Sequence, residues 1–325
     1  MLSSAAEAET EAAPLNYFLH SYGPASTPTM YLGWVFAAIA VAVFLIIALL
    51  LAGALFRKRA VDEPASIGRD NQGMRWIYIG TGVSTCILFA LAVYVLITLN
   101  TISRPARTPA LTVTVTGYDW WWKVEYEDND PARRFVTANE IHIPIGLPVL
   151  VKLKSADVIH AFWVPMLAGK TQMIPGQANE QWLEAEVEGI YRGQCTQYCG
   201  LQHAHMGFEV VAQSPADFRA WQDEQRRAVI PASAADAVAG QHFFIERCAG
   251  CHSVRGIGAA GAHAPDLTHL NSRRLIAAGL LTNTPEHQVE WIMHVQKLKP
   301  GDRMPGFELS SSEIAALSAF LSTLN

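Results

Sequence analysis

The sequence predicts a multi-domain membrane protein with three structural parts: a hairpin of two transmembrane helices, an all-β sandwich and a small all-α domain. Three observations predict this fold class. Two long uncharged apolar segments stand near the N-terminus, short alternating segments punctuated by proline and glycine follow, and helical periodicity dominates after residue 237. Half of the 325 residues are apolar and only 16% are charged, unlike an average soluble chain.

The first part rests on segments 30–56 and 76–103, which contain no charged residue over 27 and 28 positions. A helix of this length reaches about 40 Å, more than the roughly 30 Å hydrocarbon layer of a membrane. A buried core helix is the alternative, but core helices are rarely this long or apolar on all sides. We therefore predict a transmembrane hairpin over residues 30–104, preceded by a short segment, 1–29.

Flanking charge predicts the orientation of the hairpin. The first 30 residues contain no lysine or arginine, whereas the connecting loop is basic: Arg57, Lys58, Arg59, Arg69 and Arg75. The positive-inside rule places this loop in the cytoplasm, and segment 1–29 and everything after Arg104 on the external side. No cleaved signal peptide is predicted, because a basic start is lacking and the first apolar run is too long.

Residues 105–227 predict a β-sandwich. Apolar and polar residues alternate in short runs separated by turn residues, as expected for half-buried strands. These runs are 111–116, 122–126, 140–146, 147–153, 181–187 and 207–211. A helix is then predicted over 215–229, where Phe218, Trp221 and Gln225 recur at helical spacing.

One loop of this domain has the composition of a metal site. Cys195, Cys199, His203 and Met206 form the pattern Cys-x3-Cys-x3-His-x2-Met. Thiolate, imidazole and thioether are soft ligands that favour copper over magnesium or calcium, and two thiolates can bridge two copper ions. Zinc is an alternative, although thioethers bind it poorly, and so is a redox-inert disulfide between the cysteines. A further histidine ligand is expected from a neighbouring loop, where His160 is the candidate.

The C-terminal domain, 237–325, opens with an amphipathic helix over 237–248 that runs into Cys248-Ala-Gly-Cys251-His252. Cys-x-x-Cys-His is the attachment signature of a c-type haem, in which the thiols bond the haem and the histidine binds the iron. A thioredoxin-like pair and half a zinc site are the alternatives. Both are disfavoured, because the sequence has neither a βαβ pattern nor a second Cys-x2-Cys pair.

The second axial ligand of this haem has two candidates, Met293 in the helical stretch 286–297 and Met304 in the loop 299–306. Met304 is favoured, because a loop can place its side chain across the haem face. The final helix is predicted to begin with a capping box of Ser310 and Glu313. Residues 228–236 read as a linker between the two external domains. Residues 261–267 resemble the haem-edge loop of the class I cytochromes c, which implies that His263 and His269 lie at the surface.

The external part and the hairpin together resemble subunit II of the haem–copper cytochrome c oxidases over about residues 30–225. In that family, two transmembrane helices carry a cupredoxin domain that holds the binuclear copper A centre. Residues 237–325 resemble a small class I cytochrome c. The matching stretches of the first resemblance are Gly117–Trp122, Val158–His160, Gly169–Gly176 and Tyr191–Gly200.

The resemblance implies a ligand set for copper A. Cys195 and Cys199 would bridge the coppers, and the remaining ligands would be His160, His203, Met206 and the backbone carbonyl of Gln197. It also implies that Trp120, near copper A, is the point where electrons enter. The family usually has glutamate at Gln197 and often aspartate at Gln172. A backbone carbonyl does not depend on its side chain, but amides bind hard cations weakly, which weakens the expectation of magnesium at the subunit I interface.

The function implied is electron input to a bacterial caa-type oxidase, with both external domains in the periplasm. Electrons would pass from an external donor to haem c, to copper A and to subunit I, where oxygen is reduced and protons are pumped. The expected partners are subunits I and III, the lipid bilayer, and either a small soluble cytochrome or cupredoxin or an upstream respiratory complex. The apolar spans contain no histidine and so cannot hold the oxygen-reducing site.

Two other functions remain open, and a third is disfavoured. The copper-A subunit of a nitric oxide reductase and a membrane-anchored cytochrome c carrier would share many of these features. A metal- or haem-delivery protein is disfavoured, because the complete ligand sets indicate permanent sites. The net charge of −5 argues against nucleic-acid binding.

Overall fold

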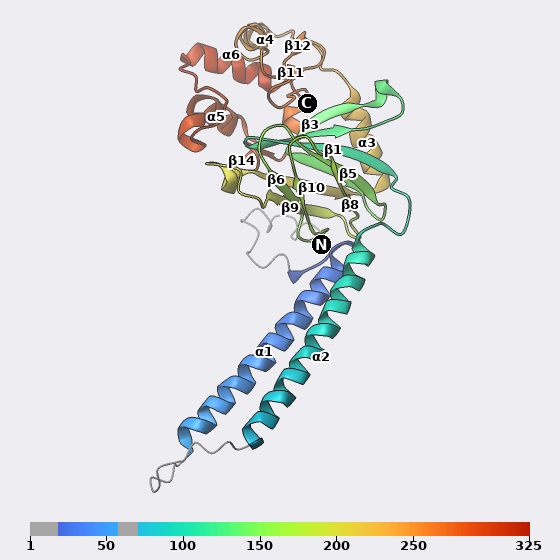
Figure 1. Cartoon of the computed structure of the whole chain (residues 1–325). Helices are drawn as coiled ribbons and strands as arrows, with labels where there is room; N and C mark the ends of the chain where they lie inside the picture. The colour runs from blue at the N-terminus through green and yellow to red at the C-terminus, as the bar shows by residue number, and fades with distance from the viewer. Residues whose placement is uncertain (1–18, 58–70) are drawn as a thin grey trace, which may run out of the picture. The chain divides into compact units, whose positions relative to one another are not determined.

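The computed structural model describes residues 19–57 and 71–325 (Figure 1). The chain forms two compact units. One comprises residues 27–104, and the other comprises residues 105–325 with the described residues that precede Thr27. Three of the basic residues used to predict the orientation of the hairpin, Lys58, Arg59 and Arg69, lie outside the described residues.

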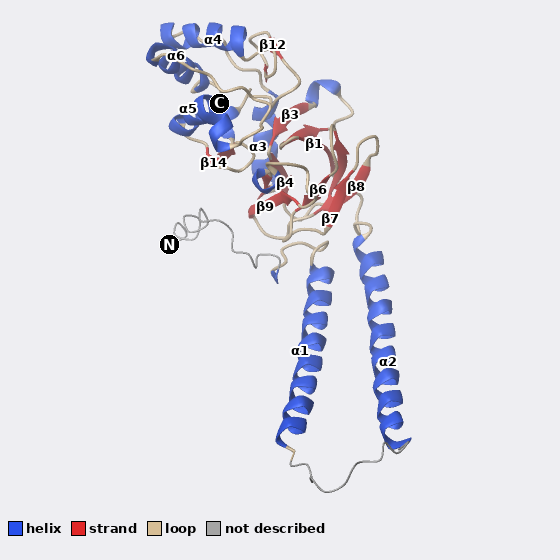
Figure 2. Cartoon of the chain, turned by 60° about the vertical axis from the view of Figure 1, so that its left-hand side comes forward, coloured by secondary structure: helices blue, strands red, loops and turns tan. Residues whose placement is uncertain are grey.

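The first unit contains the helices α1 (Thr27–Phe56) and α2 (Asn71–Ile102) (Figure 2). Both are long and apolar enough to cross a membrane, with mean hydropathies of 3.2 and 2.3 over their most apolar windows. The predicted pair of apolar helices is therefore confirmed. Each helix begins a few residues before the predicted segment. In α1 the first turn includes Pro28, whose missing N–H costs nothing there.

The predicted sandwich is also confirmed, as two five-stranded sheets in the orders β3-β2-β1-β5-β8 and β4-β10-β9-β6-β7. The pairs β1–β5 and β4–β10 are parallel and the other pairs are antiparallel. The strands are β1 (Leu111–Tyr118), β2 (Trp121–Tyr126), β3 (Phe135–Ala138), β4 (Glu140–Pro144), β5 (Val149–Ser155), β6 (His160–Trp163), β7 (Lys170–Met173), β8 (Asn179–Leu183), β9 (Gly189–Cys195) and β10 (Gly207–Gln213).

The sandwich core follows from the alternation of its strands. Every second residue of β2 is buried, and Trp122, its second residue, has no exposed surface. The Trp122 ring meets those of Phe162 and Phe208 edge-on, with centroids 6.0 and 5.0 Å apart. This arrangement ties β2 of one sheet to β6 and β10 of the other, and so fixes the strand ends from which the site residues project.

Helix α3 (Pro215–Arg226) follows the sandwich. Its N-cap is Ser214, whose hydroxyl accepts from the Asp217 N–H at 3.1 Å. The helix ends three residues before the predicted end at Val229. Val229 instead packs in the core of the C-terminal domain, and its N–H donates to the Arg255 carbonyl.

The C-terminal domain is helical, with α4 (Ala235–Arg247), α5 (Pro285–Leu298) and α6 (Ser311–Leu321). Two short hairpins complete it: β11 (Ser253–Val254) with β12 (Ala259–Ala260), and β13 (Leu275–Ile276) with β14 (Leu281–Thr282). The predicted capping box is present, with Ser310 at the N-cap and Glu313 bonding back to it. The predicted all-α fold of this domain is therefore confirmed.

One expectation about this domain is wrong. His263 is exposed, as predicted, but His269 is only 3% exposed. Its two ring nitrogens lie 2.7 and 3.0 Å from the backbone carbonyl oxygens of Asn325 and Arg227. These partners are distant in the sequence, so no local pattern marks the histidine as buried.

The crossing of α4 and α6 supplies a test of this packing. A Cβ at Gly240 would lie 1.9 Å from the Ala316 carbonyl oxygen and 2.8 Å from the Cβ of Phe320. We expect Gly240→Ala to lower the free energy of unfolding by about 1–3 kcal/mol through overpacking, although alanine is the better helix former. Denaturant unfolding measures this. Ala239→Ser, at an exposed neighbouring position, is the control, and equal stability of the two variants would contradict the packing.

Candidate functional site

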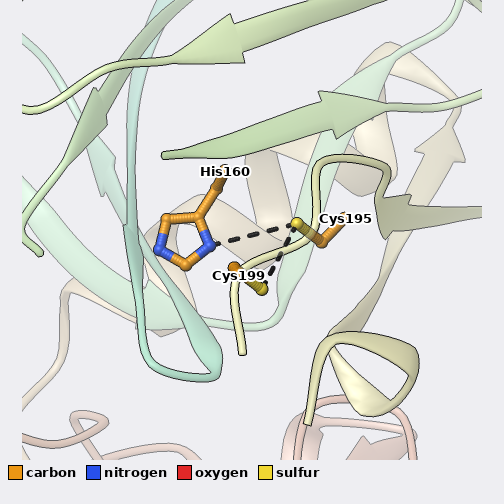
Figure 3. Close-up of side chains that lie close together, drawn as sticks. All are labelled: His160, Cys195 and Cys199. Carbon is orange, nitrogen blue, oxygen red and sulfur yellow. Dashed lines mark hydrogen bonds between the residues drawn. The ribbon is translucent and has the colours of Figure 1, made fainter. Parts of the chain in front are cut away.

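Two strands and a loop bring a histidine and two cysteines together at the end of the sandwich. His160 is the first residue of β6 and Cys195 the last of β9, and these strands pair with Phe162 opposite Cys195. Figure 3 shows the imidazole of His160 directed toward Cys195, whose sulfur faces that of Cys199. The His160 Nδ1 and Cys199 Sγ atoms lie 3.9 and 3.8 Å from the Cys195 Sγ.

The loop after β9 supplies the other predicted ligands. His203, which opens a short 3-10 turn, has its Nδ1 3.5 Å from the Cys199 Sγ, and the Met206 Sδ lies 3.8 Å from the same sulfur. The carbonyl oxygen of Gln197 is 3.2 Å from the Cys195 Sγ. All six predicted copper ligands therefore converge, and each histidine directs its Nδ1 at a different cysteine.

Most of the site is buried, and its cysteines are free. His160 has no exposed surface, and Cys195, Cys199 and Met206 are exposed by 4%, 6% and 1%. A disulfide needs a sulfur–sulfur distance of about 2 Å, so the 3.8 Å separation of Cys195 and Cys199 is that of two thiols. The inert disulfide considered from the sequence is absent from this structure.

The contact between the two sulfur atoms shifts their pKa values in opposite directions. The contact with Cys199 lowers the pKa of Cys195 to about 4, and the same contact raises the pKa of Cys199. The contact therefore favours the thiolate form of Cys195. A thiolate is the form of cysteine that binds metals.

A carboxylate orients His160 from behind. Burial alone would lower the pKa of His160, but hydrogen bonds with Asp157 and Cys195 raise it to about 9. The Asp157 Oδ1 lies 2.8 Å from the His160 Nε2, and Asp157 also accepts from the N–H groups of Asp119 and Val158. Metal-binding histidines usually engage a carboxylate or carbonyl through the second ring nitrogen. The prediction missed Asp157, although its position three residues before His160 was a usable signal.

Trp120 lies directly against the cysteine loop. Its side chain is 8% exposed, and its indole N–H donates to the Cys199 carbonyl at 2.9 Å. Gly200 has a φ of +115°, and a Cβ added to it would lie only 3.0 Å from the indole ring. The absence of a side chain at Gly200 therefore lets the indole approach the loop that holds the predicted copper ligands.

The predicted haem residues follow α4. Cys248 caps this helix, and the N–H groups of Cys251 and His252 both donate to its carbonyl. The His252 Nδ1 lies 2.8 Å from the Pro265 carbonyl oxygen, which fixes the ring and leaves Nε2 for an iron. Burial lowers the pKa of His252, which favours the neutral form that binds metals. This donor set fits a covalently attached haem c.

The two departures from the family pattern lie side by side. The Gln172 side-chain amide donates to the Gln197 Oε1 at 3.5 Å. The pair offers amide groups where magnesium prefers carboxylates. These two residues therefore do not fit a magnesium ion, and we derive no role for one.

Each of the two domains that follow the apolar helices matches a known protein family. Residues 130–214 match the family described as cytochrome c oxidase subunit II, periplasmic domain, and residues 237–325 match the cytochrome c family. The chain thus combines a periplasmic domain of the cytochrome c oxidase subunit II type with a cytochrome c domain. Its two apolar helices and its periplasmic-type domain indicate a membrane-anchored protein.

Curated relatives agree with this assignment. The chain is 36% identical over 214 residues to cytochrome c oxidase subunit 2 of Alkalihalophilus pseudofirmus, covering 65% of this chain and 60% of that protein. It is 29% identical to the subunit 2 of Bacillus sp. (strain PS3) and 28% identical to that of Bacillus subtilis. Both alignments cover 83% of this chain and 80% of the relative. The chain thus spans between three-fifths and four-fifths of the length of these three relatives.

Proposed function

We propose that the chain is the subunit through which electrons enter a terminal respiratory cytochrome c oxidase. It takes electrons from an external donor and passes them to subunit I, which reduces oxygen to water and pumps protons. The observation that carries this proposal is the convergence of two cysteines, two histidines and a methionine in the domain that matches oxidase subunit II. The same chain carries a Cys-x-x-Cys-His motif in a domain that matches cytochrome c.

The donor atoms divide between two cofactors. The copper A ligands would be His160, Cys195, Cys199, His203, Met206 and the carbonyl of Gln197. The haem c residues would be Cys248, Cys251, His252 and Met304. When bound, copper A and haem c would each accept and release single electrons.

The protein's own residues prepare these sites. Asp157 holds His160 in one orientation, and the burial of Cys195, Cys199 and Met206 keeps water away from the sulfur atoms. A buried site of fixed donors needs little rearrangement when charge changes, which suits electron transfer. Trp120, hydrogen-bonded to the Cys199 carbonyl, is the aromatic group through which electrons would reach the site.

The membrane placement and the partners follow from the same proposal. The hairpin 30–104 would anchor the chain in a bacterial cytoplasmic membrane, with the copper A domain (105–227), the linker (228–236) and the cytochrome c domain (237–325) in the periplasm. The partners would be subunits I and III and a small soluble donor or upstream respiratory complex. The covalent linkage of the two domains gives a high effective concentration of one for the other.

Metal analysis and electron paramagnetic resonance of the full chain test the proposal. The chain should be purified in detergent, matured with haem and loaded with copper. We expect two coppers that share one unpaired electron over both nuclei, and one covalent low-spin haem. A single copper with a one-nucleus hyperfine pattern, or no copper, would overturn the copper A assignment. Copurification with a subunit that reduces nitric oxide instead of oxygen would overturn the oxidase assignment.

A further inference from the structure

A lysine of the cytochrome c domain is buried against the copper A domain. Lys299, which caps the C-terminal end of α5, is 1% exposed. Its ammonium donates to the carbonyl oxygen of Trp120 at 2.8 Å and to that of Ala277 at 3.4 Å. One charged group therefore joins the tryptophan of the sandwich to a backbone carbonyl of the helical domain.

This arrangement is unusual for a lysine. Burial lowers the pKa of Lys299 to about 8, because water no longer solvates the ammonium. Within 19–57 and 71–325, no carboxylate lies within ion-pair distance of it. Backbone carbonyls are therefore its partners. Backbone carbonyls have fixed positions in the fold, whereas acidic side chains at the surface move. The ammonium of Lys299 is therefore held in one place.

The loop that follows Lys299 packs against the same tryptophan. A Cβ at Gly301, where φ is +83°, would lie 3.1 Å from the Leu201 Cδ1 and 3.9 Å from the Trp120 ring. The Gln202 amide donates to the Pro300 carbonyl at 2.7 Å. The indole is thus close to Gly200 of the cysteine loop and to Gly301 of the cytochrome c domain.

The same loop also carries Arg303 and the candidate haem ligand Met304. The Arg303 guanidinium lies 3.2 Å from Asp119 and 3.8 Å from Asp157, the carboxylate that orients His160. The Arg303 side chain is 69% exposed, so these ion pairs add little to the docking strength. The buried Lys299 ammonium is the stronger of the two contacts.

We propose that Lys299 is a positioning residue that fixes the cytochrome c domain on Trp120, so that electrons pass from haem c to copper A in a docked arrangement. The transfer moves one electron from haem c to copper A and makes or breaks no covalent bond. Two hydrogen bonds connect this lysine with the cysteine loop: the Lys299 ammonium donates to the Trp120 carbonyl, and the Trp120 indole donates to the Cys199 carbonyl. The role in electron transfer rests on the proposed function, whereas the docked position of the cytochrome c domain rests on these hydrogen bonds.

Chemical labelling of the unmodified holoprotein tests the docking. Acetic anhydride followed by mass spectrometry should label the exposed Lys297 at least about tenfold faster than Lys299, because a buried amine reacts only when its contacts open. An accessible amine with a pKa of about 8 would react faster than an ordinary lysine. Equal labelling of the two lysines would overturn the proposal.

A pair of variants tests the effect on electron transfer. We expect Lys299→Met to slow transfer from haem c to copper A on the order of tenfold, because losing a hydrogen bond from a charged donor shifts a docking equilibrium by about that factor. Lys297→Met, the matched control, should leave the rate unchanged. Lys299→Gln keeps an N–H donor and should restore most of the rate. A wild-type rate in Lys299→Met would overturn the positioning role.

The two proposals fail in different ways. A chain that contains no copper pair would overturn the proposed function, whatever the labelling of Lys299 shows. A chain with both cofactors, unchanged copper A and haem spectra and equally labelled lysines would overturn only the role of Lys299. If Lys299→Met does not fold, the labelling of the unmodified protein still decides the docking.

Discussion

Replacement of Cys199 by serine is expected to eliminate the two-copper signal and leave the covalent haem unchanged. The Cys199 sulfur contacts the Cys195 sulfur, the His203 Nδ1 and the Met206 Sδ at 3.5–3.8 Å, so it joins three of the other five predicted ligands. A serine hydroxyl is a harder donor and stays protonated, and so cannot replace a bridging thiolate. Copper content should fall from two to at most one per chain, and any remaining copper should show single-nucleus hyperfine splitting.

The control for this variant is Gln197→Ala. Only the backbone carbonyl of Gln197 faces the site, at 3.2 Å from the Cys195 sulfur, while its side chain pairs with Gln172. Alanine keeps that carbonyl, so both coppers and the shared electron should remain. Loss of copper in Gln197→Ala, or a copper pair in Cys199→Ser, would contradict the proposed ligand set.

Local patterns in the sequence predicted most elements of the fold. The apolar segments form α1 and α2. The alternating runs form β1, β2, β4, β5, β8 and β10, because a strand that is buried on one face alternates apolar and polar residues. The sandwich strands β3, β6, β7 and β9 were missed. β6 is buried without alternation, and β9 contains Gly189 and Gly193, so pairing with neighbouring strands, rather than intrinsic propensity, makes them strands.

In the candidate site, too, local features could be predicted from the sequence and tertiary contacts could not. Spacing and chemistry identified the ligands of one loop, Cys195, Cys199, His203 and Met206, because soft donors in one short loop are a local signal. His160 lies outside that loop and the Gln197 carbonyl carries no side-chain signal, so the full set of six came from the family resemblance. Lys299 and His269 were not anticipated, because their partners are backbone carbonyls far away in the sequence. Trp120 lies 179 positions from Lys299, and Asn325 lies 56 from His269. A lysine is ordinarily expected at the surface, and only the tertiary structure reveals the exception.

Replacement of Met304 by alanine is expected to leave the haem covalently attached but to remove its second axial ligand. The loop around Met304 is held in place: the Gln296 amide donates to the carbonyls of Asp302 and Met304, and the Met304 N–H donates to Asp302. Methionine–histidine ligation raises the reduction potential of haem c. The variant should therefore become high-spin, and its midpoint potential should fall on the order of 0.1 V.

The matched control is Met293→Ala, which removes the other candidate methionine from α5. Attachment through Cys248 and Cys251 and ligation by His252 are untouched in both variants, so each should retain stoichiometric haem. Redox titration and absorption spectra then separate the two methionines. If Met293→Ala becomes high-spin and Met304→Ala stays low-spin, the ligand is on the helix. The 299–306 loop would then serve to dock the cytochrome c domain on Trp120, with no part in binding iron. If Met304→Ala alone loses low-spin character, the same loop that carries Lys299 also binds the iron, which couples docking directly to the haem.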